Sequence, residues 1–414
     1  MTYDALAVWL HGRPLAELTK LRNGRLRLRF DEDGLDKYGV DSRALSLALP
    51  LTARRVEGPA LDAFVLGLLP EPPVRQMIEV ENKVPRGDDF ALLGAIGAEC
   101  AGAVQFLVSG DQPDGGSLRA LSSDEVTDIV HNLPTLKTPD GLPVGASLGG
   151  TQAKVLLTKA EAGWAWPTGG ALSTHIIKPE PIANVVVPHL VEAEHWTANL
   201  AAASGIRAAS TELQDFGGRL AIVVERYDRS HGVRLHQEDF TQALGLGVRD
   251  KYEYMGMPSR LTRIAVEAGS ASIDRDRFQD DLLTLVAFNT LIGNSDAHSK
   301  NYSMIIDRAG FFTLAPLYDA APTMLMNPSL TTAGHALNGQ ADLRFVTRSN
   351  VLKEASLWGM PTTRSERIVE LLCQTLHAAL EAVPEPETSP GLADLIRKRI
   401  QRLLDGGPLP YQAG

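Results

Sequence analysis

The segment 291–301, which reads LIGNSDAHSKN, holds the residues of this chain that are best suited to chemistry. Within it, the acid Asp296 stands five residues before the amide Asn301. Two short apolar runs separated by a DRAG turn come next, and a second acid, Asp319, follows them. An acid, an amide five residues later, a hairpin and a further acid form the layout of a kinase catalytic centre.

In such a centre each residue type has a task. A carboxylate orients the attacking hydroxyl, and we assign this role to Asp296. Mg²⁺ prefers hard oxygen ligands, which Asn301 and Asp319 would supply. His298 is interpreted as a structural polar residue, because the nearby carboxylate fills the role of the base better. Each residue alone could equally be a loop or capping residue, so the order of the elements carries the prediction.

The other parts of a kinase site are expected upstream, in the same order as in known kinases. The stretch 146–154, ASLGGTQAK, could cradle phosphate on its backbone N–H groups, although alone it also fits a tight hairpin. Lys178 ends a strand-like run and would neutralise ATP phosphates. Glu192 or Glu194, on a predicted helix, could pair with this lysine. The segment Glu225–Tyr227 takes the place of the hinge that contacts adenine.

Length and composition limit the classes of protein that are possible. The chain has 414 residues, of which 44% are hydrophobic and 22% charged, which predicts a globular protein with more than one core. Its net charge of −10 argues against general nucleic-acid binding by the bare chain. The two distant cysteines, Cys100 and Cys373, favour a reduced setting, and neither a signal peptide nor a membrane span is evident. We therefore expect a cytoplasmic protein without membrane contact.

The predicted fold class is α+β, in the form of a two-lobed, protein-kinase-like fold. It comprises an extra N-terminal subdomain (1–110), a β-rich N-lobe core with the phosphate loop, ATP lysine and hinge (111–240), and a helical C-lobe with the catalytic loop and metal site (241–414).

Two basic stripes have no clear role in this scheme. The Asn23-Gly24 pair predicts a tight hairpin with two positive-φ positions. After it, three arginines at 25, 27 and 29 share one strand face. The predicted helix 392–404 carries a further basic stripe, Arg397–Arg402, which we interpret as a solvated face.

In these motifs and their order the chain resembles the HipA family, the serine/threonine kinase toxins of bacterial HipBA-type toxin–antitoxin pairs. The most specific stretches are GNSDAHSKN at 293–301 and LAPLYD at 314–319, and ECAGAVQ at 99–105 is similar to the family's N-terminal domain. The resemblance covers nearly the whole chain. It departs at Ala153, where the family commonly has Glu, and at Ala193, where Asn is common.

The resemblance implies ATP and Mg²⁺ as cofactors, Asp296 as the catalytic residue, and Asn301 and Asp319 as metal ligands. Ser147 matches the serine whose autophosphorylation silences family members; a phosphoserine would place about −1.5 to −2 charges beside the site for ATP phosphates. Residues that match nucleotide contacts of the family are Gly149, Gly150, Thr151, Gln152, Ala153, Lys154, Lys178, Glu225, Arg226, Tyr227, His298, Ser299, Lys300, Asn301, Tyr318 and Asp319.

The resemblance further implies a non-specific serine/threonine protein kinase that phosphorylates an aminoacyl-tRNA synthetase, most often the glutamyl enzyme. Charging of tRNA would stop, and growth arrest or persistence would follow. The implied partner is a HipB-like, DNA-binding antitoxin. The chain would be held on operator DNA only through this antitoxin. Two alternatives stay open: a small-molecule kinase of the aminoglycoside or choline type, where Asp-x-His-x-x-Asn also occurs, and a non-catalytic pseudokinase scaffold.

Overall fold

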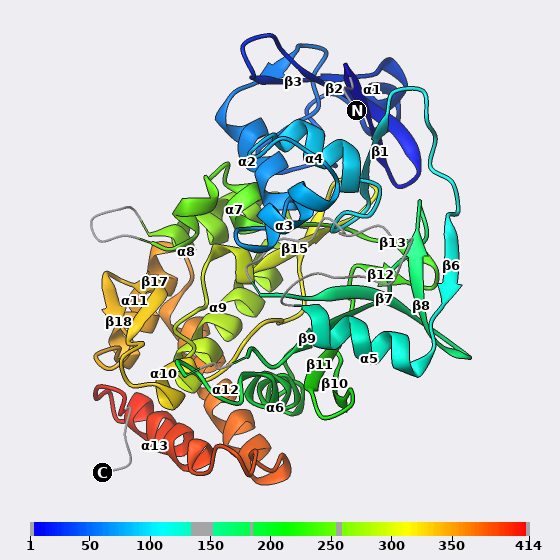
Figure 1. Ribbon diagram of the computed structural model, residues 1–414. Coiled ribbons are helices and arrows are strands. Elements are labelled where there is room, and N and C mark those ends of the chain that lie inside the picture. The colour runs from blue at the N-terminus through cyan, green and yellow to red at the C-terminus, as the bar shows by residue number, and fades with distance from the viewer. Residues whose placement is uncertain (1–3, 134–151, 183–184, 254–258, 411–414) are drawn as a thin grey trace. The chain divides into compact units, whose positions relative to one another are not determined.

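The computed structural model describes residues 4–133, 152–182, 185–253 and 259–410, which form two compact units (Figure 1). Unit 1 comprises Met1–Pro179, Gln214–Val248 and Ile305–Phe311, and unit 2 comprises Glu180–Leu213, Arg249–Met304 and Phe312–Gly414. This division differs from the predicted domains. It joins the N-terminal subdomain to most of the predicted N-lobe, and it assigns 180–213 to the unit that holds the C-lobe helices.

The first half of unit 1 is built on a five-stranded sheet in the order β4-β3-β2-β1-β5. Apolar side chains alternate along its strands, as the buried Leu6, Val8 and Leu10 show, so that one face packs on a core of leucines. The strands are β1 (Ala5–Leu10), β2 (Arg13–Lys20), β3 (Leu26–Phe30), β4 (Val56–Glu57) and β5 (Val104–Val108), and the helices are α1 (Glu32–Tyr38), α2 (Pro59–Leu68), α3 (Val74–Glu81) and α4 (Asp89–Ile96).

The predicted hairpin at the start of β3 is present, but its turn differs from the prediction. Of the two turn residues only Gly24 has a positive φ, of +83°, while the side chain of Asn23 accepts a hydrogen bond from the Arg25 N–H at 3.1 Å. The arginine stripe that follows is paired: Arg27 lies 2.6 Å and Arg25 3.3 Å from the carboxylate of Glu57 on β4. The stripe is therefore engaged within the sheet.

The second sheet of unit 1 has the order β10-β11-β9-β7-β8-β6, and α5 packs against it through a shared apolar cluster. Its strands are β6 (Ser117–Ala120), β7 (Val155–Ala160), β8 (Gly163–Thr168), β9 (His175–Pro179), β10 (Thr211–Asp215) and β11 (Leu220–Glu225), and α5 spans Ser123–Asn132. The short elements β12 (Arg229–Ser230), β13 (Val233–Arg234), β14 (His236–Asp239) and α7 (Phe240–Ala243) follow β11.

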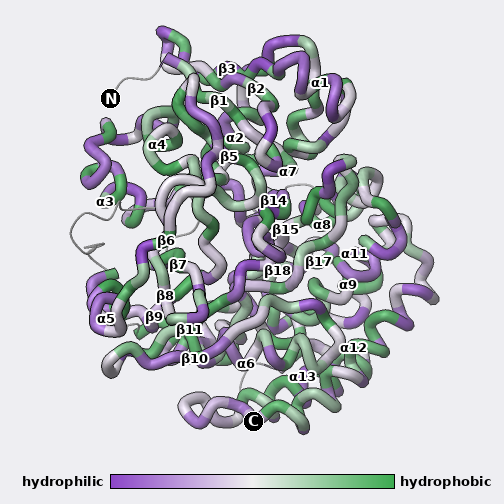
Figure 2. The backbone as a smooth tube through the Cα atoms, turned by 90° about the vertical axis from the view of Figure 1, so that its right-hand side faces the viewer, coloured by the Kyte–Doolittle hydropathy of each residue, from purple (hydrophilic) through white to green (hydrophobic). Residues whose placement is uncertain are grey.

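Unit 2 is mainly helical. Its long helices α9 (Arg275–Ile292), α12 (Thr362–Ala382) and α13 (Leu392–Leu404) pack on one another, and α12 also contacts α6 (Leu190–Ala203) and α11 (Arg348–Leu357). The other elements are the turn η2 (Val248–Lys251), α8 (Arg260–Arg263), the π-helix η3 (Ile264–Ala268), η4 (Ser299–Asn301), β15 (Ser303–Ile306), β16 (Phe312–Leu314), α10 (Thr323–Met326), β17 (Thr332–Leu337) and β18 (Gln340–Asp342). Figure 2 shows hydrophobic and hydrophilic residues alternating along α12 and α13, as expected of helices with one buried face.

The basic stripe of α13 is not uniformly solvated, so the prediction was wrong at Arg399. This side chain is fully buried and donates to Thr290 O at 2.6 Å and to Leu291 O at 2.8 Å. These carbonyls belong to the last turn of α9, where the regular intrahelical partners run out, and Thr290 O also accepts the Gly293 N–H at 3.2 Å. Burial lowers the pKa of Arg399 to about 9. The end of α9, from which the predicted catalytic loop leaves, is thus held by a cation.

None of the helices in the described ranges combines the length and apolarity needed to cross a membrane.

A second buried ionisable group, Glu238, lies in unit 1. Its carboxyl group accepts hydrogen bonds from Ser46 Oγ at 2.5 Å and from the Leu47 N–H at 3.0 Å. Burial raises the pKa of Glu238 from 4.5 to about 8, and the neighbouring Asp239 adds to the shift. The folded protein therefore keeps a proton that the unfolded chain releases between these two pH values. The stability from this proton is complete below about pH 4.5 and is lost as the pH rises to 8.

We expect Glu238→Gln to flatten this pH dependence, because the amide keeps the shape of the side chain but has no proton to lose. The loss is at most about 1.4 kcal/mol per pH unit and lessens near pH 8, so the wild type should lose about 2 kcal/mol more than the variant between pH 6 and pH 8. Urea unfolding at both pH values measures the difference. The exposed Glu32→Gln serves as the control, and equal slopes for Glu238→Gln and wild type would contradict the assignment.

Candidate active site

The predicted catalytic loop leaves α9 through a sharp turn at Gly293. This residue has a φ of +73°, a conformation that glycine adopts without strain, and its carbonyl accepts a hydrogen bond from the Met324 N–H at 3.0 Å. A Cβ atom at Gly293 would lie 3.0 Å from Leu325 Cγ. Glycine is therefore needed both for the backbone conformation and for the close packing of α10 on the loop.

Within the loop, hydrogen bonds fix the backbone of Asp296. Its N–H donates to Asn294 Oδ1 at 3.1 Å, and its carbonyl accepts from the His298 N–H and from Asn301 Nδ2, both at 2.8 Å. The Asp296 side chain remains 51% exposed. The backbone is thus held while the carboxylate faces outward. The bond from Asn301 uses the nitrogen of its amide, so the amide oxygen, the atom of the pair that can ligate Mg²⁺, is not used by this bond.

The third predicted residue, Asp319, is tied to the same loop. Its neighbour Tyr318 donates its hydroxyl to Lys300 O at 2.6 Å and lies 2.6 Å from Ser303 Oγ. Asp319 itself has a φ of +55°, which is uncommon for a residue with a side chain, although aspartate adopts it more readily than most. The charge of its carboxylate acts on His298 and opposes the lowering of that imidazole's pKa. Asp296 and Asn301 are thus joined by a hydrogen bond, and Asp319 lies within electrostatic range of the same loop.

His298 lies beside the acid but is not suited to act as a base partner. Burial lowers its pKa to about 4, the positive charge of Lys251 adds to this, and Asp319 opposes it. Its Nε2 is 3.9 Å from Asp296 Oδ1, which is too long for a hydrogen bond. Its Nδ1 and the buried hydroxyl of Ser299 lack a hydrogen-bond partner among the described residues. Buried polar atoms of this kind are costly unless a ligand or water meets them, and they fit a loop that receives a polar molecule.

Strand β17 supports the loop from behind, which the sequence did not indicate. A Cβ atom built on Gly334 would lie 2.6 Å from the carbonyl carbon and oxygen of Ala297 and from the His298 nitrogen. Gly334 also accepts a hydrogen bond from the Glu253 N–H at 3.0 Å. The strand and the loop are therefore in contact backbone to backbone, at a distance that only glycine permits.

A second residue that the sequence did not indicate is Tyr252. Its hydroxyl donates to Asp296 Oδ1 at 2.5 Å, and its ring stands edge-on to His298 with the ring centroids 4.8 Å apart. The tyrosine and the acid are 44 positions apart in sequence, so no local spacing pattern relates them. Only the fold of unit 2 makes Tyr252 part of the site.

Unit 1 holds the predicted nucleotide residues. Lys178 is buried in β9 opposite Ile222 of β11, in the central part of the sheet. The predicted hinge follows β11, but the Arg226 N–H already donates to Thr174 O at 2.9 Å, and the Tyr227 hydroxyl donates to Gln237. The backbone donor of Arg226 is therefore committed within the protein, and this part of the hinge prediction has no support from the geometry.

The predicted phosphate loop is described only at its end. Gly149, Gly150 and Thr151, together with Ser147, lie outside the described residues. Ala153 packs against the core of the second sheet, and the side-chain nitrogen of Gln152 is buried with no hydrogen-bond partner within the described part of the chain.

On α6, the two candidate partners of the lysine differ. Glu192 is engaged by His189 and by Thr388, whereas Glu194 is buried. The helix itself begins at Leu190.

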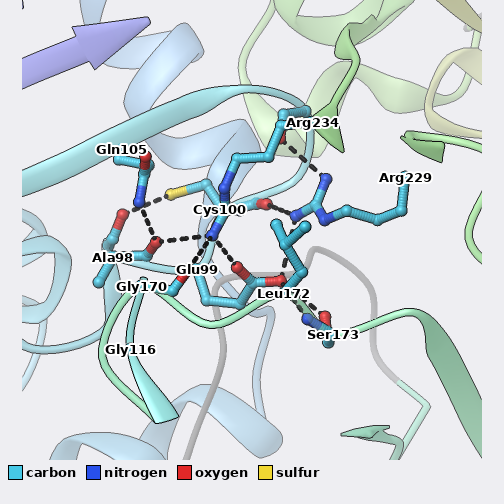
Figure 3. Close-up of polar contacts among 12 residues, drawn as sticks. Ala98, Glu99, Cys100, Gln105, Gly116, Gly170, Leu172, Ser173, Arg229 and Arg234 are labelled. Carbon is cyan, nitrogen blue, oxygen red and sulfur yellow. Dashed lines mark hydrogen bonds and ion pairs between the residues drawn. The ribbon is translucent and has the colours of Figure 1, made fainter. Parts of the chain in front are cut away.

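A buried ionic network joins the N-terminal subdomain to the segment after β11 (Figure 3). Glu99 Oε1 accepts from Ser173 Oγ at 2.6 Å, from Arg226 Nη1 at 3.2 Å and from Arg229 Nη2 at 3.1 Å. In Figure 3 the side chains of Arg229 and Arg234 both reach Glu99, and Arg234 forms an ion pair with its other oxygen. Burial alone would raise the pKa of Glu99, but the three guanidinium groups outweigh it and lower the pKa.

A second carboxylate completes this network. Asp228 lies 2.8 Å from Arg226 and 3.0 Å from Arg229, and it accepts the Gly102 N–H at 2.7 Å. Burial and the charge of Arg226 lower the pKa of Arg229 to about 10. Three arginines and two acids are thus buried together, and each depends on the others for its charge to be tolerated.

Family models match both parts of the chain: the HipA N-terminal domain at residues 6–107 and the HipA-like C-terminal domain at residues 146–380. This chain belongs to the HipA family. The protein Y4mE of Sinorhizobium fredii is 33% identical to it over 408 residues, 93% of each chain. The serine/threonine-protein kinase toxin HipA of Shewanella oneidensis is 32% identical over 293 residues, 66% of each chain.

A solved structure agrees with this assignment. The structure of the S. oneidensis MR-1 toxin–antitoxin system, HipA with HipB and its operator DNA, matches with a TM-score of 0.77 at 25% identity, over 97% of this chain and 96% of that one. The predicted HipA membership and α+β, kinase-like fold are confirmed. The stretches that carried the resemblance, around Glu99 and around Asp296, fall inside the two matched domains.

We expect Glu99→Gln to lower the free energy of unfolding by about 3–5 kcal/mol, because it removes one of the two carboxylates that balance three buried arginines. Glu57→Gln removes a carboxylate from the more exposed pairs of β4 and should cost much less. Denaturant unfolding of the two variants and wild type makes the comparison. Similar small losses in both variants would show that the network around Glu99 does not hold unit 1 together.

We expect Gly334→Ala to displace the catalytic loop, because its methyl group would overlap the backbone at Ala297 and His298. Phosphotransfer from ATP should fall at least tenfold, since small misplacements of reacting groups are costly. The control is Gly115→Ala, at a glycine with no atom within 4 Å of the added carbon. An active Gly334→Ala protein would mean that β17 does not constrain the loop.

Proposed function

We propose that this protein is a Mg-ATP-dependent serine/threonine protein kinase and the toxin of a HipBA-like pair. The observation that carries the proposal is the geometry of one loop in unit 2. There the backbone of Asp296 is fixed by Asn301, and Asp319 lies within electrostatic reach of the same loop. A half-exposed carboxylate next to two oxygen donors is the arrangement that phosphoryl transfer requires.

Each side chain has a chemical role in this proposal. Asp296 accepts a hydrogen bond from the acceptor hydroxyl. This bond directs the hydroxyl oxygen at the γ-phosphorus, and the carboxylate receives the proton of the hydroxyl. Asn301 and Asp319 hold Mg²⁺, which neutralises charge on the phosphates when bound. Among the described residues no group of three or more His, Cys, Asp or Glu could hold a metal by itself, so the ion would depend on the amide of Asn301 and on nucleotide oxygens. Lys178 neutralises the α- and β-phosphates.

The other predicted contacts complete the nucleotide site. They are the loop Gly149–Lys154, the hinge residues Glu225 and Tyr227 with the remaining backbone groups of Arg226, and His298, Ser299, Lys300 and Tyr318. Ser147 is the proposed site of autophosphorylation. A phosphate there would add about −1.5 to −2 charges next to the loop that receives ATP phosphates, and would silence the kinase.

The proposed substrate is an aminoacyl-tRNA synthetase, the glutamyl enzyme first among them, and the proposed partner is a HipB-like antitoxin. Two observations support the partner. The S. oneidensis HipA structure that matches 97% of this chain contains HipB and operator DNA. The net charge of −10 also disfavours direct binding of DNA by this chain, so the antitoxin would make that contact.

Incubation of the full-length protein with labelled ATP and Mg²⁺ tests the proposal. We expect label on Ser147 and on glutamyl-tRNA synthetase, and we expect Asp296→Asn to slow both by two or more orders of magnitude, the scale of a positioned acid–base group. Asp33→Asn, at an exposed position of α1, should behave as wild type. Phosphoproteomes of cells that express wild type or Asp296→Ala identify further substrates.

Three outcomes would contradict the proposal. A protein that binds ATP but labels no protein would not be a protein kinase. Transfer to an aminoglycoside or choline without protein labelling would indicate a small-molecule kinase. Growth arrest that survives Asp296→Asn would indicate a non-catalytic scaffold.

A further inference from the structure

We propose that Tyr252 is a positioning residue for Asp296, and that its hydroxyl holds one oxygen of the carboxylate so that the other meets the acceptor hydroxyl. The inference rests on the proposed phosphotransfer at Asp296 and adds a member to that site. The result is a three-part chain, from acceptor hydroxyl to Asp296 to Tyr252, in which the third group orients the second, as in other enzymes that use a base with an orienting partner.

The first line of argument is the contact itself. The Tyr252 hydroxyl lies 2.5 Å from Asp296 Oδ1, a short distance that is typical of a hydroxyl donating to an ionised carboxylate. The Asp296 side chain is 51% exposed, and the χ2 rotation of aspartate has a broad, weakly restricted energy profile. The backbone bonds of the loop do not fix this rotation. A donor on Oδ1 restricts it, and we assign Oδ2 to the acceptor.

The second line of argument is that Tyr252 is itself held firmly. Its ring stands at 83° to the His298 ring with centroids 4.8 Å apart, and Lys251 Nζ lies 5.8 Å from its centroid. Its carbonyl accepts a hydrogen bond from Arg260 Nη1 at 3.3 Å, and Arg260 is only 4% exposed. The next residue, Glu253, donates its N–H to Gly334 O on β17. Preorganised support of this kind is what a precise site needs.

The third line of argument is that His298, the other candidate for orienting the Asp296 carboxylate, does not hydrogen-bond to it. It stands two residues after Asp296, but its Nε2 is 3.9 Å from Oδ1, beyond hydrogen-bond distance. His298 instead supplies the surface against which the Tyr252 ring packs. The orienting donor of Asp296 is therefore on the segment before α8, far away in sequence.

Tyr252→Phe in the full-length protein tests the inference, because it removes only the hydroxyl. A synthetic peptide of residues 140–156, which contains Ser147, is the acceptor, and initial rates are measured against both ATP and peptide. We expect kcat to fall about 10- to 100-fold, the equivalent of one hydrogen bond to a charged group, while KM for ATP and for the peptide stays within about twofold. If the hydroxyl only stabilised the fold, its loss would not lower kcat while both KM values stay unchanged.

Two comparisons sharpen the test. Tyr38→Phe removes a hydroxyl whose bond, to Leu10 O, is 3.4 Å long and lies in the N-terminal subdomain, and it should leave the kinetics unchanged. In the Asp296→Asn background, Tyr252→Phe should cause little further loss, because groups that act through one another are not additive. Thermal melting of each variant checks that folding is intact, and the double-variant comparison stays informative even if Tyr252→Phe melts somewhat lower.

The outcomes separate this inference from the proposed function. A wild type that phosphorylates neither peptide nor protein refutes the proposed function. An active wild type with an equally active Tyr252→Phe refutes the role of Tyr252. So does a Tyr252→Phe enzyme with a lower KM for the peptide and unchanged or higher kcat, since the hydroxyl would then occupy the place of the acceptor. Full additivity with Asp296→Asn would also overturn the inference.

Discussion

The hydrogen bond from the Asn301 amide to the Asp296 carbonyl, at 2.8 Å, is the constraint on which the candidate site depends. It closes the loop on itself through the nitrogen of the Asn301 amide, while the carboxylate of Asp296 stays half exposed. Three neighbouring contacts stabilise this arrangement of the loop. Arg399 holds the end of α9, Gly293 makes the exit turn, and Gly334 lets β17 approach the loop from behind.

A second constraint organises unit 1. Glu99 and Asp228 are buried with three arginines, and the desolvation of five charges is tolerated only because the geometry pairs them. An apolar cluster of the same volume could be as stable, so the network is better understood as a device for specificity than as a source of stability. It places the segment after β11 relative to Ser173, which precedes the β9 strand of Lys178. The N-terminal subdomain is thus part of the structure that holds the proposed nucleotide residues.

The two units also differ in how charge is used. In unit 2 the functional charges stay near the surface, where Asp296 is half exposed and can exchange partners. In unit 1 the charges of the network around Glu99 are buried and paired with one another. Glu238 differs from them, since burial without a cation raises its pKa to about 8 and makes its contribution depend on pH. The catalytic loop and the network around Glu99 therefore hold their charges in different electrostatic surroundings.

Much of the local structure followed from sequence pattern, because amphipathic period and turn residues act over a few positions. The predicted helix 392–404 coincides with α13, and the hairpin before the second acid forms as β15 and β16. The kinase-like fold was predicted from the order of all the expected site elements, from the Gly-Gly loop to Asp319, and from the resemblance to the HipA family. Local pattern failed where a distant contact decides: Arg399 is buried because α9 ends beside it.

The sequence by itself determined which side chains are available for chemistry and in what order they occur, since the identity and spacing of residues are set by the chain alone. Only the tertiary structure decided which distant groups meet them. Tyr252 contacts Asp296, which lies 44 positions later in the sequence. Gly334 contacts Ala297, although the β15–β16 hairpin lies between them in the sequence. Glu99 pairs with arginines more than a hundred residues away. The reason is physical: a contact between distant residues depends on the packing of every element between them, and no local pattern of residues encodes that packing.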